Sequence, residues 1–329
     1  MVNRFSGIAI RSLACALPKQ SVSLEQFQNR FQPEKIERFR EIVGIEKLHI
    51  ASEGMRTSDL AVAAANLIFD DRTIARDEID VLLFISQTPD AIAPATSALL
   101  QKRLGLPSHL LALDINQGCA GFLTGIQTAA HLLASPAIRN VLILGGDTLT
   151  RLVNSDDPAT AMLFGDAGFA AIIGRDSTSS EWLLTSGIES STAITIPHKS
   201  SFTMSGTEVF NFSITKVPEQ ILQLMRTAEL TPSSLDYLLL HQANAFILRQ
   251  IARMCHLQES KVPCRIAPYG NTSVASLPLL LCELYSEGIR GNKRVIFSAF
   301  GVGLTWISTA LTFNFDSCHA PILLETPTQ

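Results

Sequence analysis

Two kinds of apolar pattern alternate along the whole chain. Short, continuous apolar runs are typical of buried strands, and the Ala- and Leu-rich segments between them have helical length. The strand-like runs are residues 79–85, 110–115, 141–144, 235–240 and 294–298, with a further N-terminal strand expected at 7–13. The helix-like segments are residues 57–69, 96–104, 121–133, 217–228, 246–257 and 273–287. This alternation predicts an α/β fold with largely parallel sheets.

The second half of this pattern repeats the first. The matching runs are 79–84 with 235–240 and 139–143 with 293–297. The turn that carries Cys119 matches the turn that carries Asn271, and the offset stays at about 150 residues throughout. An internal duplication is the economical interpretation. It predicts one half at 1–175, the other at 176–329, and pseudo-symmetric positions for Cys119 and Asn271.

Composition narrows the class of protein. Apolar residues make up 47% of the chain and charged residues 17%, a balance that can bury a large core and is not that of a disordered chain. The net charge is −4 and the chain has no long basic run, so the sequence lacks the positive charge that nucleic-acid binding usually requires. No segment reaches the ~18 apolar residues of a membrane span. Leu13-Ala14-Cys15 looks like a lipoprotein cleavage box, but Arg11 interrupts the short apolar run before it.

The six cysteines are spread thinly and show no paired spacing, which indicates reduced thiols and a cytoplasmic location. Cys255, His256 and Cys264 have poor spacing for zinc, so no metal is expected. The sequence also lacks a G-x-G-x-x-G turn, a P-loop and a G-x-S-x-G elbow. These absences disfavour nucleotide-phosphate binding and an α/β-hydrolase.

Cys119 is the candidate nucleophile. It stands in Gly-Cys-Ala-Gly between a buried strand and a helix, where the helix dipole favours a thiolate and the small neighbours leave room for an acyl group. The alternative is a buried packing cysteine. His241 ends a strand, where it can act as an acid, a base or a hydrogen-bond donor. The alternative there is a capping cluster that includes Asn244.

Two further turns carry candidate groups. Asn271 lies in a turn that leads into a helix, and the simplest alternative is that it only caps this helix. The segment 300–303 follows a buried strand, and its backbone N–H groups can form an oxyanion hole. A tight turn between strands is the alternative for this segment.

Together these segments resemble the β-ketoacyl-acyl-carrier-protein synthase III family of the thiolase superfamily. The similarity runs from about Ile8 to Leu311, in order and at family-like spacing. Five ordered blocks are far more specific than any one of them. The blocks are Asp114-Ile-Asn-Gln-Gly-Cys-Ala-Gly-Phe122, Leu163-Phe-Gly-Asp-Ala-Gly168, His241-Gln-Ala-Asn244, Tyr269-Gly-Asn-Thr-Ser273 and Phe300-Gly-Val-Gly-Leu-Thr-Trp306.

The resemblance implies a five-layered αβαβα thiolase-like fold of two duplicated α/β halves, usually as a homodimer. It implies a decarboxylative Claisen condensation of an acyl thioester with a malonyl thioester, without a cofactor. Coenzyme A thioesters and acyl-carrier protein are the implied partners, in fatty-acid or specialised, polyketide-like biosynthesis. Cys119 becomes the nucleophile, His241 and Asn271 support decarboxylation, and the backbone N–H groups of Cys119 and Val302 form the oxyanion hole.

Substrate residues follow less directly from the resemblance. Arg151 matches a family arginine beside the coenzyme A adenine, but the tryptophan often found near position 38 is absent. Phe300, Phe210 and Ala93 are further substrate-binding candidates, and Ala93 stands where the family often has a bulky Phe that reaches the partner's acyl pocket. We therefore expect a larger pocket. Phe246 occupies a position that is often basic for carrier-protein docking. Nearby candidates for that role are Arg249 and Arg253.

Two other functions remain open from the sequence. One is a thiolase-fold acyltransferase that forms an ester or amide from the Cys119 acyl-enzyme without decarboxylation. The presence of Asn271 argues mildly against it. An alcohol that attacks the acyl-enzyme needs a base more than it needs hydrogen-bond donors that stabilise an enolate. The other is a non-catalytic partner subunit of a condensing heterodimer. Such subunits usually lack the nucleophile, which this chain keeps.

Overall fold

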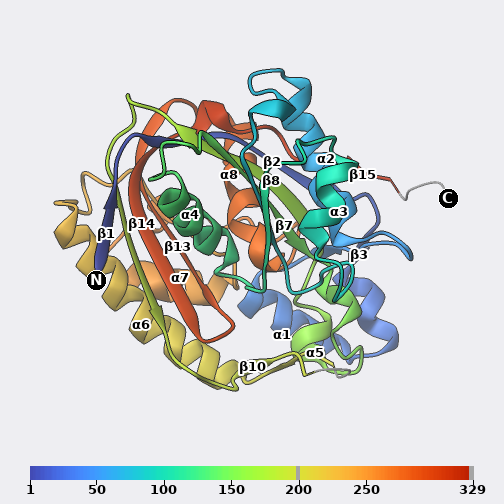
Figure 1. The fold of residues 1–329 in the computed structure, drawn as a ribbon. Coiled ribbons are helices and arrows are strands. Elements are labelled where there is room, and N and C mark those ends of the chain that lie inside the picture. Colours follow the sequence, from blue (N-terminus) through green and yellow to red (C-terminus); the bar gives the residue numbers. More distant parts are fainter. Residues whose placement is uncertain (198–200, 326–329) are drawn as a thin grey trace.

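The computed structural model describes residues 1–197 and 201–325, and two mixed β-sheets form its frame (Figure 1). The six-stranded sheet has the order β15 (Ile322–Leu324), β2 (Ile8–Pro18), β8 (Ala167–Arg175), β7 (Asn140–Asp147), β5 (Val81–Ile85), β6 (Leu111–Ile115). The five-stranded sheet has the order β1 (Val2–Phe5), β9 (Trp182–Ile188), β14 (Thr305–Asn314), β13 (Asn292–Gly301), β12 (Tyr237–Leu240). Two small antiparallel pairs are β3 (Ser21–Ser23) with β4 (Lys47–His49) and β10 (Ile194–Thr195) with β11 (Thr203–Met204).

The two large sheets follow the same plan. In one, β5 runs parallel to β7, which pairs antiparallel with β8, which pairs antiparallel with β2. In the other, β12 runs parallel to β13, which pairs antiparallel with β14, which pairs antiparallel with β9. The halves are thus duplicated α/β units. The expectation of largely parallel sheets was wrong, because β8 in one sheet and β14 in the other run antiparallel to both of their neighbours. The division at 175/176 lies between β8 and β9 and stays a prediction.

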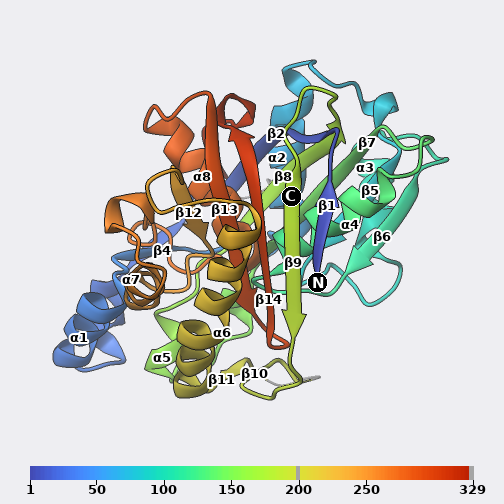
Figure 2. The same cartoon turned by 90° about the vertical axis from the view of Figure 1, so that its left-hand side faces the viewer.

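Helices complete a five-layered αβαβα arrangement. Helices α4 (Gly121–Leu132) and α8 (Ser276–Ser286) lie between the two sheets and contact both. Helices α2 (Thr57–Asp70) and α3 (Thr96–Arg103) cover the six-stranded sheet, while α6 (Gly206–Thr227) and α7 (Ala245–Met254) cover the other sheet, as Figure 2 shows. Helix α1 (Pro33–Val43) packs beside α7, and α5 (Pro158–Ala161) is a single turn. Short 3₁₀ helices are η1 (Leu24–Asn29), η2 (Arg76–Glu78), η3 (Leu149–Arg151), η4 (Glu259–Lys261), η5 (Ser273–Ala275) and η6 (Phe315–Ser317).

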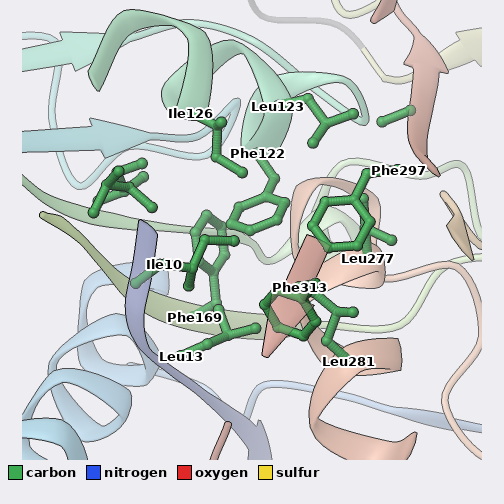
Figure 3. Packing of buried hydrophobic residues seen from close by; sticks show 14 of the residues in the cluster. Ile10, Leu13, Phe122, Leu123, Ile126, Phe169, Leu277, Leu281, Phe297 and Phe313 are labelled. Carbon is green, nitrogen blue, oxygen red and sulfur yellow. The ribbon is translucent and has the colours of Figure 1, made fainter. Parts of the chain in front are cut away.

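Aliphatic and aromatic side chains together fill the space between the sheets (Figure 3). Phe122 from α4 meets Phe169 from β8 edge to face, with ring centroids 5.3 Å apart. Phe297 and Phe313 from the facing sheet meet in the same way at 5.3 Å. Each such pair adds about 0.5–1.5 kcal/mol beyond the burial of its area. This packing fixes α4, and therefore the turn before it, against both sheets.

Three elements differ from the sequence expectation. Strand β6 was expected to be buried, but it is the outer strand of its sheet, and Leu111 and Leu113 are 44% and 41% exposed. Helix α6 begins at Gly206 and continues through Pro218, so it is much longer than the segment expected from 217. The segment from 273 divides into η5 and α8. Among residues 1–197 and 201–325, no helix has the length and apolar character that a membrane crossing requires.

Candidate active site

The turns that carry Cys119, His241 and Asn271 meet at one cavity of about 90 Å³. Cys119 follows β6 and precedes α4, His241 follows β12, and Asn271 precedes η5. Cys119 and His241 each follow a strand that runs parallel to its neighbour, one in each large sheet, and a bridge to Phe164 holds the backbone of Asn271. Most other side chains around the cavity are apolar: Leu149, Leu163, Phe164, Ile194, Phe202, Met204, Val209 and Ile247. Such walls suit an alkyl chain or another elongated apolar group.

Cys119 is partly exposed to this cavity and otherwise surrounded by protein. Strand β13 passes so close that a Cβ on Gly301 would lie 2.8 Å from the Cys119 Cβ, which explains the glycine. Desolvation raises the pKa of the Cys119 thiol to about 12, although the hydrogen bond between Cys119 and Ser273 opposes this rise. The thiol is therefore neutral at neutral pH. Desolvation therefore opposes the thiolate that the helix N-terminus favours.

His241 is buried and neutral. Desolvation lowers the pKa of its imidazole to about 3. Its Nδ1 lies 2.5 Å from the Ser276 hydroxyl, which also accepts a bond of 3.3 Å from the Gln242 N–H. A hydroxyl has one proton and two lone pairs, so Ser276 can accept from the amide and donate to Nδ1. In that arrangement the imidazole carries its proton on Nε2.

Asn271 is also buried and its amide is fixed in orientation. Its Oδ1 accepts a bond of 2.9 Å from the Ser273 N–H, and its Nδ2 is 3.5 Å from the Ala243 carbonyl. Its backbone pairs with the segment of Leu163, whose carbonyl accepts the Asn271 N–H at 2.9 Å. The side chain thus contacts the start of η5, as the capping alternative predicted, while it also lines the cavity. Helix α7 is capped by Asn244, which accepts from the Ile247 N–H at 2.7 Å.

The candidate oxyanion segment also lines the cavity and lies beside Cys119 and His241. Phe300 and Gly301 end β13, and Val302 follows them at the cavity. The Phe300 ring meets the His241 ring edge to face, with centroids 5.6 Å apart. The Gln117 side chain donates to the Val302 carbonyl at 3.3 Å, which ties this segment to the turn before Cys119.

The remaining substrate and docking candidates do not line this cavity. Arg151 lies in a separate depression, where its guanidinium donates to the carbonyls of Ser52 and Met55. Ala93 is exposed on the loop before α3. Phe210 stacks on Phe246 at 5.4 Å, next to the cavity-lining Val209 and Ile247. Arg249 lines another depression beside α7, and Arg253 is exposed at the end of that helix.

Sequence reasoning missed Ser273, Ser276 and Asp147. The two serines follow Asn271 by two and five residues. Ser273 is the first residue of η5, and Ser276 is the first residue of α8. Asp147 ends the buried strand β7, where a carboxyl group is unusual, and that was the available signal. No group of three or more His, Cys, Asp or Glu side chains in the described part of the chain could hold a metal ion.

The matching family models and a sequence relative of this chain name the same enzyme. The family model of 3-oxoacyl-[acyl-carrier-protein] synthase III matches residues 113–191, and the model of its C-terminal part matches residues 225–313. The chain is 35% identical over 281 residues to β-ketoacyl-[acyl-carrier-protein] synthase III of Streptococcus pyogenes serotype M5, covering 80% of this chain and 86% of the relative.

Solved structures agree with these matches. The 3-oxoacyl-(acyl-carrier protein) synthase of Burkholderia xenovorans LB400 superposes with a TM-score of 0.95 at 29% identity, covering 98% of this chain and 99% of that one. The 3-oxoacyl-[acyl-carrier-protein] synthase III of Aquifex aeolicus VF5 superposes with a TM-score of 0.88 at 27% identity, covering 93% and 100%. The similarity therefore extends over nearly the whole fold.

Proposed function

The chain belongs to the 3-oxoacyl-[acyl-carrier-protein] synthase III family, and from this premise we propose which of its residues perform the chemistry. It is an acyltransferase that condenses an acyl unit with a malonyl unit, with loss of CO2, to give a 3-oxoacyl product. In the proposal Cys119 carries the acyl group, and His241 and Asn271 act on the malonyl unit. The observation that carries it is the shared cavity of the three side chains.

The first half-reaction is acyl transfer to Cys119. Its sulfur attacks the incoming thioester carbonyl, and the leaving thiol takes up a proton. The negative charge of the tetrahedral intermediate falls on the former carbonyl oxygen. The backbone N–H groups of Cys119 and Val302 receive this oxygen in our proposal, because both residues line the cavity and donors aimed at such an oxygen are effective in a dry site.

The second half-reaction is decarboxylation and carbon–carbon bond formation. When the malonyl unit loses CO2, charge develops on its thioester oxygen. A neutral imidazole with its proton on Nε2 and an amide held by Ser273 are two donors suited to that charge. Removal of one such donor typically costs roughly 10²–10³ in rate. The resulting carbanion attacks the acyl group on Cys119 and releases the 3-oxoacyl product.

Carrier protein is the partner we propose at the surface of α7. Relatives of this chain are named for the acyl-carrier protein. Arg249 and Arg253 project from α7 near Phe210 and Phe246 and can contact an acidic helix or a phosphate. Without a tryptophan for the adenine, we propose that carrier-protein thioesters are preferred to coenzyme A thioesters. No bound cofactor is part of the proposed chemistry.

We further propose a homodimer in the cytoplasm. Strand β6 is an outer strand with Leu111 and Leu113 exposed, and Ile92 on the neighbouring loop is 90% exposed. An exposed apolar edge strand is a template for pairing with a second strand, and a second copy can cover it. The loop 87–94 then faces the partner's acyl pocket. Free thiols at all six cysteines fit a reducing compartment.

A panel of acyl-coenzyme A and acyl-carrier-protein thioesters tests the function. Intact mass after incubation should show one acyl group on Cys119, and addition of a malonyl thioester should then release CO2 and free the enzyme. Acylation without CO2 release would favour the acyltransferase that makes an ester or amide. A higher kcat/KM for acyl-coenzyme A than for the matching carrier-protein thioester would refute the proposed donor preference.

A further inference from the structure

One buried carboxyl group at the site has no place in the mechanism above. Asp147 is wholly buried at the end of β7. Its Oδ1 accepts from the Gln87 N–H at 2.7 Å and from the Ser86 hydroxyl at 3.0 Å. Its Oδ2 is buried without a hydrogen-bond partner among the described residues. An unpaired buried carboxylate oxygen is costly, so its presence next to a nucleophile calls for a function.

Ser273 lies between this carboxyl group and the nucleophile. Its Oγ is 3.8 Å from the Cys119 Sγ. Ser273 begins η5, which packs against β7, so its hydroxyl lies beside Asp147 and opposes the rise of the Asp147 pKa on burial. Ser273 is wholly buried, and its backbone has φ 51°, a left-handed conformation that non-glycine residues adopt uncommonly. Such local strain is often kept at functional sites, where it aims a side chain.

The chemistry of the three groups sets the direction of the hydrogen bonds. An ionised carboxylate only accepts, so a Ser273 hydroxyl that turns toward the free Asp147 Oδ2 gives its proton to the carboxylate and presents its lone pairs to the Cys119 thiol. We propose that Asp147, acting through the Ser273 hydroxyl, accepts the thiol proton of Cys119 during acyl transfer. This inference rests on the proposed function of Cys119 and deepens it.

The step balances as a double proton transfer. As Sγ forms its bond to the thioester carbonyl carbon, the thiol proton passes to Ser273 Oγ and the Ser273 proton passes to Asp147. The carbonyl π electrons move to the oxygen. When the tetrahedral intermediate collapses, the C–S bond to the carrier breaks, and the proton returns from Asp147 through Ser273 to the leaving thiolate. Ser273 and Asp147 end the cycle unchanged.

The protonation equilibria support this assignment over the alternative base in the cavity. Burial raises the pKa of Asp147 to about 6, which leaves it ionised at neutral pH and near the range of general bases. Burial lowers the pKa of His241 to about 3, so His241 takes up a proton far less readily. Because the thiol has a pKa of about 12, its proton leaves in concert with attack.

The groups that face Asp147 are the Ser86 and Thr88 hydroxyls, the Gln87 and Val274 amides, Ser273 and the Cys119 thiol. None of these carries a positive charge. The ionisation of Asp147 therefore sets the acid side of the pH profile of acylation. The rate should rise with pH as Asp147 loses its proton, through about pH 6.

Single-turnover acylation, followed by intact mass from about pH 5 to 8, tests the relay in four variants. Ser273→Ala removes the hydroxyl, and Ser273→Gly does so while suiting the positive φ. Asp147→Asn keeps an oxygen for the Gln87 N–H but removes the base. Ser308→Ala is the matched control, because it deletes another buried serine hydroxyl that bonds Gln220 and Ser298 instead.

Loss of a general base typically costs 10²–10⁴-fold, so we expect at least about 100-fold slower acylation in the first three variants, without the rise near pH 6. Ser308→Ala should match the wild type. Acyl-enzyme formed slowly in Ser273→Ala should still react with malonyl thioester at close to the normal rate. Normal acylation in Ser273→Gly or Asp147→Asn overturns the relay, as does equal slowing of both half-reactions. A wild-type enzyme that takes no acyl group on Cys119 would instead overturn the proposed function.

Discussion

Ser276 Oγ lies 2.5 Å from His241 Nδ1, and both side chains are buried beside the cavity. The Ser276 hydroxyl accepts from the Gln242 N–H and can donate to Nδ1, which leaves the imidazole proton on Nε2. A histidine in this tautomer donates to a developing enolate instead of removing a proton. The contact therefore supports the role in decarboxylation that we propose for His241.

Ser276→Ala should slow decarboxylation by about 10- to 100-fold, the loss usual when a partner that orients a working histidine is removed. Acylation of Cys119 should change little. Single-turnover mass spectrometry with the malonyl thioester added second separates the two rates. Ser286→Ala, which removes a hydroxyl bonded to the Cys282 carbonyl on the same helix, is the control. Equal rates in the two variants would show that Ser276 does not orient His241.

Cys119→Ser should abolish stable acylation and condensation, because a serine hydroxyl is a much weaker acid and nucleophile than a thiol at this position. Intact mass after incubation with an acyl thioester provides the measurement. Cys264→Ser, at another partly buried thiol beside α7, should acylate normally. Condensation by Cys119→Ser at close to the wild-type rate would remove Cys119 from the mechanism.

Folding stability should fall in acid partly through His241. Its pKa is about 3 in the folded protein and near 6.5 when unfolded, so the unfolded chain binds the extra proton. Stability is then unaffected above about pH 6.5 and declines below it by up to about 1.4 kcal/mol per pH unit, until pH approaches the folded value. Urea titrations at several pH values, compared with His241→Phe, measure this slope. A variant with the wild-type slope would show that another group dominates.

Much of this arrangement follows from sequence patterns, and the exceptions share a physical cause. The strand-to-helix turns that bear Cys119 and His241 are local features, so apolar periodicity and small residues predict them. The approach of Ser273 to Asp147 is not local, because it depends on how η5 packs against β7. The exposure of β6 was missed because an apolar edge strand has the same pattern whether it is covered by its own chain or by another.

Assembly can be tested at that strand. Leu113→Lys places a charge on the exposed edge of β6, and if a second copy covers this edge, the dimer should dissociate. Light scattering at micromolar concentration provides the measurement. Leu323→Lys is a matched control, since Leu323 is 55% exposed on β15 at the opposite edge of the same sheet. A wild-type protein that is monomeric and fully active would contradict the proposed homodimer.

Asn271 separates the two half-reactions most sharply. In the proposed mechanism, acyl transfer needs the Cys119 sulfur and the backbone N–H groups, whereas decarboxylation needs donors for charge on a different oxygen. Asn271→Ala should therefore leave acylation largely intact and slow condensation by roughly 10²–10³, so that acyl-enzyme accumulates. His241→Ala should impair decarboxylation as strongly. Single-turnover mass spectrometry, with the malonyl thioester added second, follows both steps.

The capping contact of Asn271 makes a different prediction for the same variant. Its Oδ1 accepts from the Ser273 N–H, so its loss also costs about 1 kcal/mol of stability if capping is its only function. Asn314→Ala is the matched control, because its Oδ1 accepts from the N–H two residues on, that of Asp316, at the start of the 3₁₀ helix η6. Two variants with similar losses of stability but different rates of condensation would separate the roles. If Asn271→Ala clears its acyl-enzyme as fast as the wild type, Asn271 is a cap alone, and ester or amide formation from the acyl-enzyme becomes the better account of the site.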